Sequence, residues 1–149
     1  MIIRVARRDE VPQIVALLAE DPLGAAREDL SEPLPRAYYE AFDTMAASPE
    51  NEMLVAEVDG KIVGCLQLTF IPGLSRLGGL RGQIESVRVS ATLRGGGYGR
   101  QMFEWAIERC REKGCKTVQL TTDKSRSDAH RFYESLGFVA SHEGLKLTL

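Results

Sequence analysis

The sequence lacks the features that identify membrane, secreted and nucleic-acid-binding proteins. It has no apolar run near the length of about 20 residues that crosses a bilayer. Its start, MIIRVARRDE, has neither the apolar stretch nor the small-residue cleavage site of a signal peptide. The 19 basic and 21 acidic residues are spread along the chain and give a net charge of -2, so there is no basic surplus for a nucleic acid or a membrane surface. We therefore expect an intracellular protein with a small partner.

Cysteine is scarce as well. The three cysteines, Cys65, Cys110 and Cys115, cannot all pair, and no two of them have the C-x-x-C spacing of a metal or redox site. Reduced thiols of this kind are typical of a cytoplasmic chain. The sequence thus predicts a cytoplasmic protein without a bound metal ion.

The composition predicts one globular domain over residues 1–149. Apolar residues make up 44% of the chain and charged residues 27%, close to the average for globular proteins. A chain of 149 residues is long enough for one hydrophobic core and short for two. The sequence contains neither an internal repeat nor a low-complexity segment that would divide it.

Apolar periodicity predicts an α/β (α+β) chain in which strands and helices are mixed. Strands are expected at residues 2–6, 53–58, 61–71, 83–90, 117–121, 138–140 and 145–149. Helices are expected after a cap at Asp9, at residues 36–47, after the glycines of residues 95–99, and after a capping box at Ser125 and Asp128. Asp59-Gly60 predicts a tight hairpin, because both residues tolerate positive φ. Strict alternation along residues 83–90 places Glu85 on one face with Val87 and Val89.

Residues 94–100, RGGGYGR, lie between a strand that ends at Val89 and an amphipathic helix. Backbone N–H groups at such a helix start point toward an anion, and glycines allow a phosphate to approach closely. The two flanking residues, Arg94 and Arg100, could add charge-assisted contacts. Alternatively, the glycines form only a flexible turn before the helix. Walker and dinucleotide-binding motifs are excluded, because no Gly-Lys-Ser/Thr follows and Arg100 occupies the last glycine position of G-x-G-x-x-G.

Three motifs together resemble one family. Arg94-x-x-Gly97-x-Gly99 resembles the pyrophosphate-binding signature, R/Q-x-x-G-x-G/A, of the GCN5-related N-acetyltransferase (GNAT) family. The preceding I-E-x-V-x-V of residues 84–89 and the later A-x-x-F-Y-x-x-x-G-F of residues 129–138 match the same family in the right order. The order of expected strands and helices is similar along the whole chain. The resemblance implies the GNAT fold, a central mixed, mostly antiparallel sheet of about six to seven strands flanked by about four helices.

The resemblance also implies that acetyl-CoA is the cosubstrate. The glycine segment would hold its pyrophosphate, and the exposed backbone edge of residues 87–89 would pair with its pantetheine arm as an added strand does. Arg126 stands where the family often has an asparagine that contacts pantetheine, and it could meet a phosphate instead. The implied cofactor-binding residues are Val87, Arg88, Val89, Arg94, Gly95, Gly96, Gly97, Tyr98, Gly99, Arg100 and Arg126.

The family comparison implies two catalytic residues. Tyr133 aligns with the tyrosine that often protonates the departing CoA thiolate, and a phenol with a pKa of about 10 is protonated at neutral pH and suits that role. Tyr133 could instead be a packing residue or orient the thioester. Glu85 aligns with a carboxylate that deprotonates the attacking amine in many relatives. Its alternatives are a structural carboxylate that anchors a cation or one that faces solvent.

The resulting functional hypothesis is an acetyl-CoA-dependent N-acetyltransferase that acts on a primary amine of a small molecule or peptide by direct attack. Two alternatives stay open: an acyl-CoA-binding sensor or regulatory module, and a protein N-acetyltransferase whose basic target meets the acidic residues of the segment 21–50. Acceptor contacts are expected in that same segment. The apolar C-terminus is compatible with pairing in a homodimer.

Overall fold

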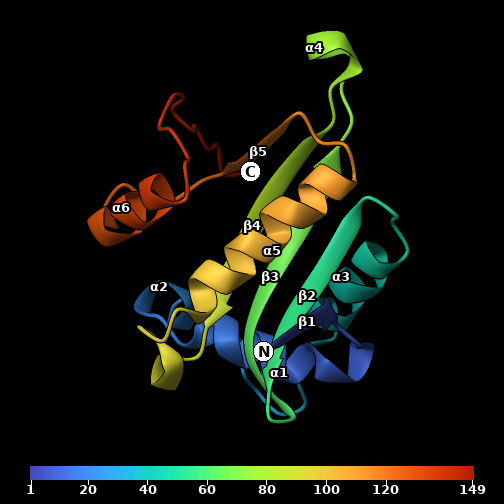
Figure 1. Ribbon diagram of the computed structural model, residues 1–149. Coiled ribbons are helices and arrows are strands. Elements are labelled where there is room, and N and C mark those ends of the chain that lie inside the picture. The colour runs from blue at the N-terminus through green and yellow to red at the C-terminus, as the bar shows by residue number, and fades with distance from the viewer.

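The structure is a computed structural model that describes residues 1–149, apart from the side chain of Ser127. Its centre is a five-stranded sheet in the order β1-β2-β3-β4-β5 (Figure 1). The strands are β1 (Ile2–Val5), β2 (Asn51–Val58), β3 (Lys61–Ile71), β4 (Arg81–Val89) and β5 (Thr117–Leu120). The first three neighbouring pairs are antiparallel and the β4–β5 pair is parallel, so the expected mixed, mostly antiparallel sheet is confirmed.

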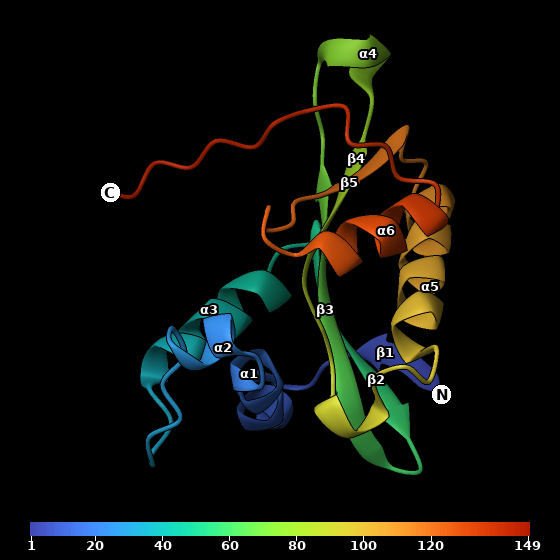
Figure 2. The ribbon, with the colours of Figure 1, turned by 90° about the vertical axis from the view of Figure 1, so that its left-hand side faces the viewer.

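Helices cover both faces of the sheet (Figure 2). They are α1 (Val11–Ala19), α2 (Pro22–Ala25), α3 (Arg36–Ala46), α4 (Ser75–Gly78), α5 (Tyr98–Glu112) and α6 (Ser127–Ser135), with 3-10 turns η1 (Arg8–Glu10) and η2 (Ala91–Leu93). Helices α1, α2 and α3 lie on one side of the sheet, whereas α5 and α6 lie on the other. No helix in the described part of the chain is long and apolar enough to span a bilayer.

Strand alternation divides the core into two halves. On β2, Leu54 and Ala56 pack toward α5, whereas Met53 and Val55 pack toward α1 and α3. A strand that is buried on both faces needs apolar residues at every position, and this explains the continuous apolar run of β2. The sheet therefore contributes to both halves of the core and fixes the positions of the helices around it.

Glycines and a hairpin turn form where the sequence predicts them. Asp59 and Gly60 have φ values of 50° and 74° and connect β2 directly to β3. Gly114 and Gly137, with φ of 77° and 92°, follow the ends of α5 and α6. Because positive φ terminates a right-handed helix with little strain only at glycine, these two residues set the helix ends.

The two C-terminal strands predicted from alternation are wrong. Residues 138–140 and 145–149 form no ladder with any described strand, and Val139 and Leu145 are 80% and 94% exposed. Alternation favours a strand only where a neighbouring strand accepts its backbone hydrogen bonds. The sheet of this chain consequently has five strands instead of six or seven.

Two predicted helix caps are also wrong. The Ser125 hydroxyl donates to Asp123 at 2.6 Å, so it does not cap α6, which begins after Arg126. Asp9 lies inside the 3-10 turn η1, and the carboxylate of Glu10 instead accepts the N–H of Arg7 at 2.7 Å. In both places a nearby carboxylate forms a local turn that competes with the expected cap.

Candidate active site

Strands β4 and β5 separate in the middle of the sheet. Their parallel ladder runs only from Arg81 opposite Thr117 to Ile84 opposite Leu120. β5 ends there, whereas β4 continues for five more residues to Val89. The edge of β4 that faced β5 is therefore without a strand partner over residues 85–89 of the described chain.

A β-bulge begins at the point of separation. Two ladder pairs, Gln67 with Glu85 and Cys65 with Arg88, have one residue between them on β3 but two on β4. Ser86, the first of these two residues on β4, has φ of 55°, a left-handed conformation that is uncommon outside glycine. The bulge changes which side chains share a face beyond this point.

The bulge overturns the predicted placement of Glu85 with two valines. Val87 and Val89 pack against the same apolar cluster as Ile84, on the α5 side of the sheet. Glu85 stands opposite Gln67, and directly opposed residues of an antiparallel pair point to the same face. Because Gln67 lines a cavity beneath α1 and α3, the exposed Glu85 belongs to that opposite side.

The main chain of Val87 and Val89 faces the open edge of β4. The N–H of Ser90 donates to Val63 of β3 at 2.8 Å, so the alternate residues of β4 direct their polar groups away from β3. The Val87 carbonyl accepts from Arg88 Nη1 at 2.9 Å, and the Val89 carbonyl accepts from Arg94 Nε at 3.5 Å. Both donors are arginine side chains, so an extended guest that adds to the sheet edge would have to share or displace these two contacts.

The glycine segment turns from β4 into α5 with two left-handed residues. Gly95 and Gly97 have φ values of 83° and 79°, and a Cβ on either would meet no other atom within 4 Å. Glycine is therefore required by backbone conformation rather than by lack of space. Gly97 is the N-cap of α5 and has no side chain to cap it, and no acceptor meets the N–H groups of residues 98–100 within the described chain. This arrangement has the donors and the helix dipole of an anion site.

The two arginines of the segment have different surroundings. Arg94 is half exposed beside the turn and lies 4.0 Å from a carboxylate oxygen of Glu20. Arg100 donates to the Ser135 hydroxyl of α6 at 2.6 Å and lies 3.7 Å from Glu104. Arg100 thus joins α5 to α6. Arg94 is therefore the arginine that could contact an anion bound at the start of α5.

Tyr133 is part of an aromatic cluster between α5 and α6. Its ring centroid lies 5.4 Å from that of Phe103 and 5.5 Å from that of Phe132, in edge-to-face geometry, with Phe138 at 6.3 Å. Such contacts fix the ring. Its hydroxyl has no hydrogen-bond partner among the side chains and backbone groups that the structure describes. The ring can therefore pack in this cluster while the hydroxyl remains available to donate a proton.

Two carboxylates that the sequence reasoning missed connect the α1–α2 turn to β4 and the loop after it. Asp21 accepts the N–H of Gly24 at 2.6 Å and lies 3.3 Å from Arg88 Nε, while Glu20 accepts the N–H of Ala91 at 2.7 Å. Burial raises the pKa of Asp21, but the Gly24 N–H and the charges of Arg88 and Arg126 outweigh it, so the pKa lies below its usual value. The Asp21-Pro22 pair, a cap followed by proline, was the sequence signal for this turn.

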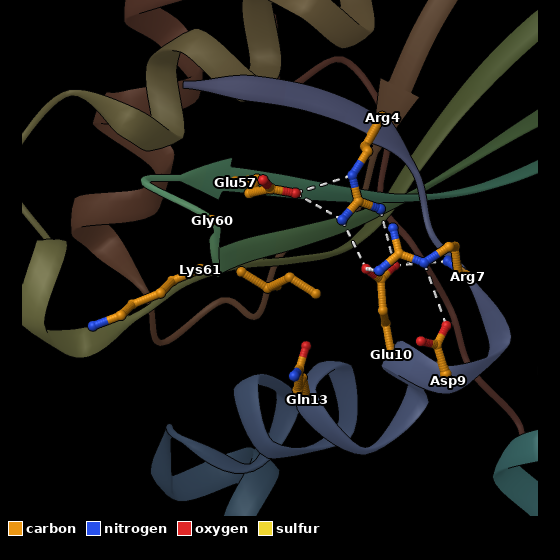
Figure 3. A pocket seen from close by; sticks show the side chains of 9 residues that line it. Arg4, Arg7, Asp9, Glu10, Gln13, Glu57, Gly60 and Lys61 are labelled. Atoms are coloured by element: carbon orange, nitrogen blue, oxygen red, sulfur yellow. Dashed lines mark hydrogen bonds and ion pairs between the residues drawn. The ribbon is translucent and has the colours of Figure 1, made fainter.

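A larger polar cavity, of about 560 Å³, lies away from this region between β1, η1 and the β2–β3 hairpin (Figure 3). Its arginines already have anionic partners: Arg4 Nη2 lies 2.7 Å from Glu10 and 2.8 Å from Glu57, and Arg7 Nη2 lies 2.6 Å from Glu10. Hydrogen bonds from Arg4 hold the pKa of the buried Glu10 carboxyl below its usual range. We interpret this cavity as a structural ion-pair cluster, since none of the predicted site residues lines it.

Comparison with known proteins assigns the family. The sequence profile of the acetyltransferase (GNAT) family matches residues 14–138. The aminoalkylphosphonate N-acetyltransferase of Salmonella typhimurium is 31% identical over 107 residues, which cover 72% of this chain and 69% of that protein. The glucosamine 6-phosphate N-acetyltransferase of Trypanosoma brucei brucei is 37% identical over 90 residues, which cover 60% and 59% of the two chains.

A solved structure agrees over the whole fold. A protein of Bacillus halodurans C-125, described as a transcriptional regulator, has 49% sequence identity and a TM-score of 0.96, with 99% of each chain covered. The open edge of β4, followed by the glycine turn into α5, occurs here in a chain with the sequence of an acetyltransferase. The protein belongs to the GNAT family and is an acetyltransferase.

Proposed function

We propose that the protein transfers an acetyl group from acetyl-CoA to a primary amine of a small molecule or peptide by direct attack. One observation carries this proposal: the open edge of β4 leads through a single short loop into the N–H groups at the start of α5. An extended amide-containing arm can pair with the first, and a pyrophosphate can bind to the second. The names of two relatives, which specify N-acetylation of small amines, support the same reading.

The residues present fit the parts of acetyl-CoA. The N–H groups of Tyr98, Gly99 and Arg100 would hold the pyrophosphate, with Arg94 beside them as a cation. The main chains of Val87 and Val89 would hold the pantetheine arm. Arg126 is exposed at the start of α6 and close enough to Asp21 for its charge to lower the pKa of that carboxyl, and it would contribute a further positive charge.

The transfer needs one base and one acid. The protonated amine first loses one proton to Glu85, directly or through water, and its neutral nitrogen then forms a bond to the thioester carbon. The carbon–sulfur bond breaks, and the nitrogen loses its second proton to water as the amide forms. The departing thiolate takes the phenolic proton of Tyr133. Glu85 is exposed on the α1–α3 side of the sheet and Tyr133 lies on the α5–α6 side, so acid and base approach the reacting carbon from opposite sides.

The donor site is tested by calorimetric titration of CoA into two matched variants. Gly97→Glu introduces a side chain and a negative charge at the proposed pyrophosphate site, and we expect CoA binding to be lost. Gly60→Glu is the control, because Gly60 also has positive φ and open space but lies in the β2–β3 turn. Unchanged CoA affinity in a folded Gly97→Glu protein, or equal losses in both variants, would refute the assignment.

A second candidate function is an acyl-CoA-binding regulator with little turnover. It is favoured by one observation, the close similarity to a protein described as a transcriptional regulator. Incubation with acetyl-CoA and a panel of amines separates the two functions when free CoA is measured by a thiol assay. Release of CoA that depends on an amine supports the enzyme, and tight binding without release supports the regulator.

We also propose that the protein acts in the cytoplasm. Burial raises the pKa of the Cys65 and Cys110 thiols to about 12, so neither is readily deprotonated. The support comes from the sequence, in which three cysteines cannot all pair and no two have the C-x-x-C spacing.

A further inference from the structure

An apolar cavity of about 160 Å³ lies between the sheet and helices α1 and α3. Its walls are aliphatic and aromatic side chains, among them Ile14, Phe42 and Met45. The floor carries two polar residues, Gln67 of β3 and Ser86 of β4. No charged residue lines the cavity within the part of the chain that the structure describes. A guest in this cavity would therefore have to be uncharged and mostly apolar.

The cavity adjoins the proposed reaction centre. Ser86 is the bulged residue where β4 and β5 have just separated, and it follows Glu85 in the chain. Gln67 stands directly opposite Glu85 on the same face of the sheet. A molecule with its apolar part in the cavity would thus have its polar end beside Ser86 and Gln67, the two residues that neighbour the proposed base, Glu85.

We propose that this cavity is the acceptor pocket and that it selects primary amines with a short aliphatic or aromatic group and no phosphate. The inference rests on the proposed function. A dry apolar cavity of about 150 Å³ is known to accept benzene, so the size suits a phenyl or branched aliphatic group. A phosphate or phosphonate placed here would lose its hydration without a cation to replace it.

This selectivity differs from that of the two relatives whose names specify a phosphonate or phosphate on the acceptor. Each methylene buried in the cavity should improve acceptance of the amine about fourfold, until the cavity is full. A charged group on the same arm should cancel that gain. The preference for one acceptor amine over another would therefore be set by the cavity walls, and it would not depend on how tightly acetyl-CoA binds.

Two matched variants of α3 test the pocket. Ala41 lines the cavity yet is exposed, so it lies at the mouth, and Ala41→Phe should block entry. Ala46→Phe makes the same change at an exposed position of the same helix outside the cavity. The ligands are 2-phenylethylamine and 3-methylbutylamine, compared with 2-aminoethylphosphonate. Binding to the CoA-saturated protein is measured by calorimetry, and turnover by CoA release.

We expect 2-phenylethylamine to bind at least tenfold more tightly than 2-aminoethylphosphonate, and Ala41→Phe to remove that advantage while Ala46→Phe keeps it. Equal binding to the Ala41→Phe and wild-type proteins, or a preference for the phosphonate, overturns the pocket. The two proposals fail differently. If apolar amines bind but no CoA is released, the proposed pocket stands and the proposed acetyl transfer is contradicted. If CoA is released with the phosphonate alone, only the proposed pocket is contradicted.

Discussion

The carboxylate of Glu20 accepts a hydrogen bond from the main-chain N–H of Ala91 at 2.7 Å, across 71 residues of sequence. Glu20 is the C-cap of α1, which covers the proposed acceptor side of the sheet, and Ala91 begins the 3-10 turn η2 that precedes the glycine turn. The same carboxylate lies 4.0 Å from Arg94. One side chain thus connects the two proposed substrate sites and partly neutralises the arginine of the donor site.

Replacing Glu20 with glutamine should strengthen CoA binding slightly. The amide oxygen of the new side chain can still accept the Ala91 N–H, but the negative charge beside Arg94 is gone. Exposed ion pairs are worth about 0.5 kcal/mol, so we expect an increase of about twofold in CoA affinity at low salt. Calorimetric titration of the Glu20→Gln and wild-type proteins at two salt concentrations measures it. Weaker binding in the glutamine variant would show that the carboxylate itself supports the donor site.

Removing the Tyr133 hydroxyl should slow transfer without weakening donor binding. The phenyl ring of the Tyr133→Phe variant can keep the contacts with Phe103 and Phe132, whereas the acid is lost. Loss of a positioned general acid typically reduces the rate about 10²-fold or more. Steady-state CoA release gives kcat, and calorimetry gives CoA affinity; Tyr39→Phe, on α3, is the control. An unchanged kcat in Tyr133→Phe would leave Tyr133 with a packing role.

A β-branched residue at Ser86 should destabilise the protein. The φ of 55° at Ser86 is strained for any residue with a Cβ and most strained for valine. We expect Ser86→Val to lower the free energy of unfolding by about 1–2 kcal/mol. Ser90→Val, at ordinary φ of -48°, should change it much less. Denaturant titration followed by circular dichroism compares the two, and equal stabilities would argue against the bulge.

The contact of α5 with β4 is tested by a double-mutant cycle. A Cβ at Gly82 would overlap the sulfur of Cys110, so Gly82→Ala should cost about 1–3 kcal/mol of stability. Combining it with Cys110→Ala makes room for the methyl group and should recover part of that loss. Two additive mutations would mean that Gly82 and Cys110 do not meet.

Glu10 should make stability depend on pH. Hydrogen bonds from Arg4 lower the pKa of Glu10 in the folded protein, so its contribution is present above the unfolded pKa of about 4.3 and is lost as pH falls through the folded pKa. We expect Glu10→Gln to destabilise the protein by about 1–3 kcal/mol at pH 7 and by less at pH 3. Urea titrations at both pH values give the difference. A penalty that grows toward pH 3 would contradict this sign.

Local sequence patterns predict the parts of the structure that local forces decide. The Asp59-Gly60 turn and the glycine turn before α5 follow from backbone conformations that few residues adopt, and both are confirmed. The sequence also predicts the buried apolar run of β2 and the apolar stripe of α5, because each depends only on the periodicity of its own segment.

The remaining features depend on partners far away in sequence. The bulge at Ser86 is set by the register between β3 and β4, and a period of two cannot reveal it. It moved Glu85 to the opposite face from Val87 and Val89, which changed the proposed base from a neighbour of the valines to a neighbour of the acceptor cavity. The contact between Glu20 and Ala91 likewise joins segments that no motif relates.

The central claim is acetyl transfer from acetyl-CoA to an amine. The most direct measurement is to incubate the wild-type protein with acetyl-CoA and 2-phenylethylamine, then quantify free CoA by thiol assay and the N-acetylated amine by mass spectrometry. The account predicts equimolar CoA and N-acetyl product, formed by the wild-type protein and not by Gly97→Glu. Free CoA without N-acetylated product from any amine of the panel, or no consumption of acetyl-CoA at all, would contradict it.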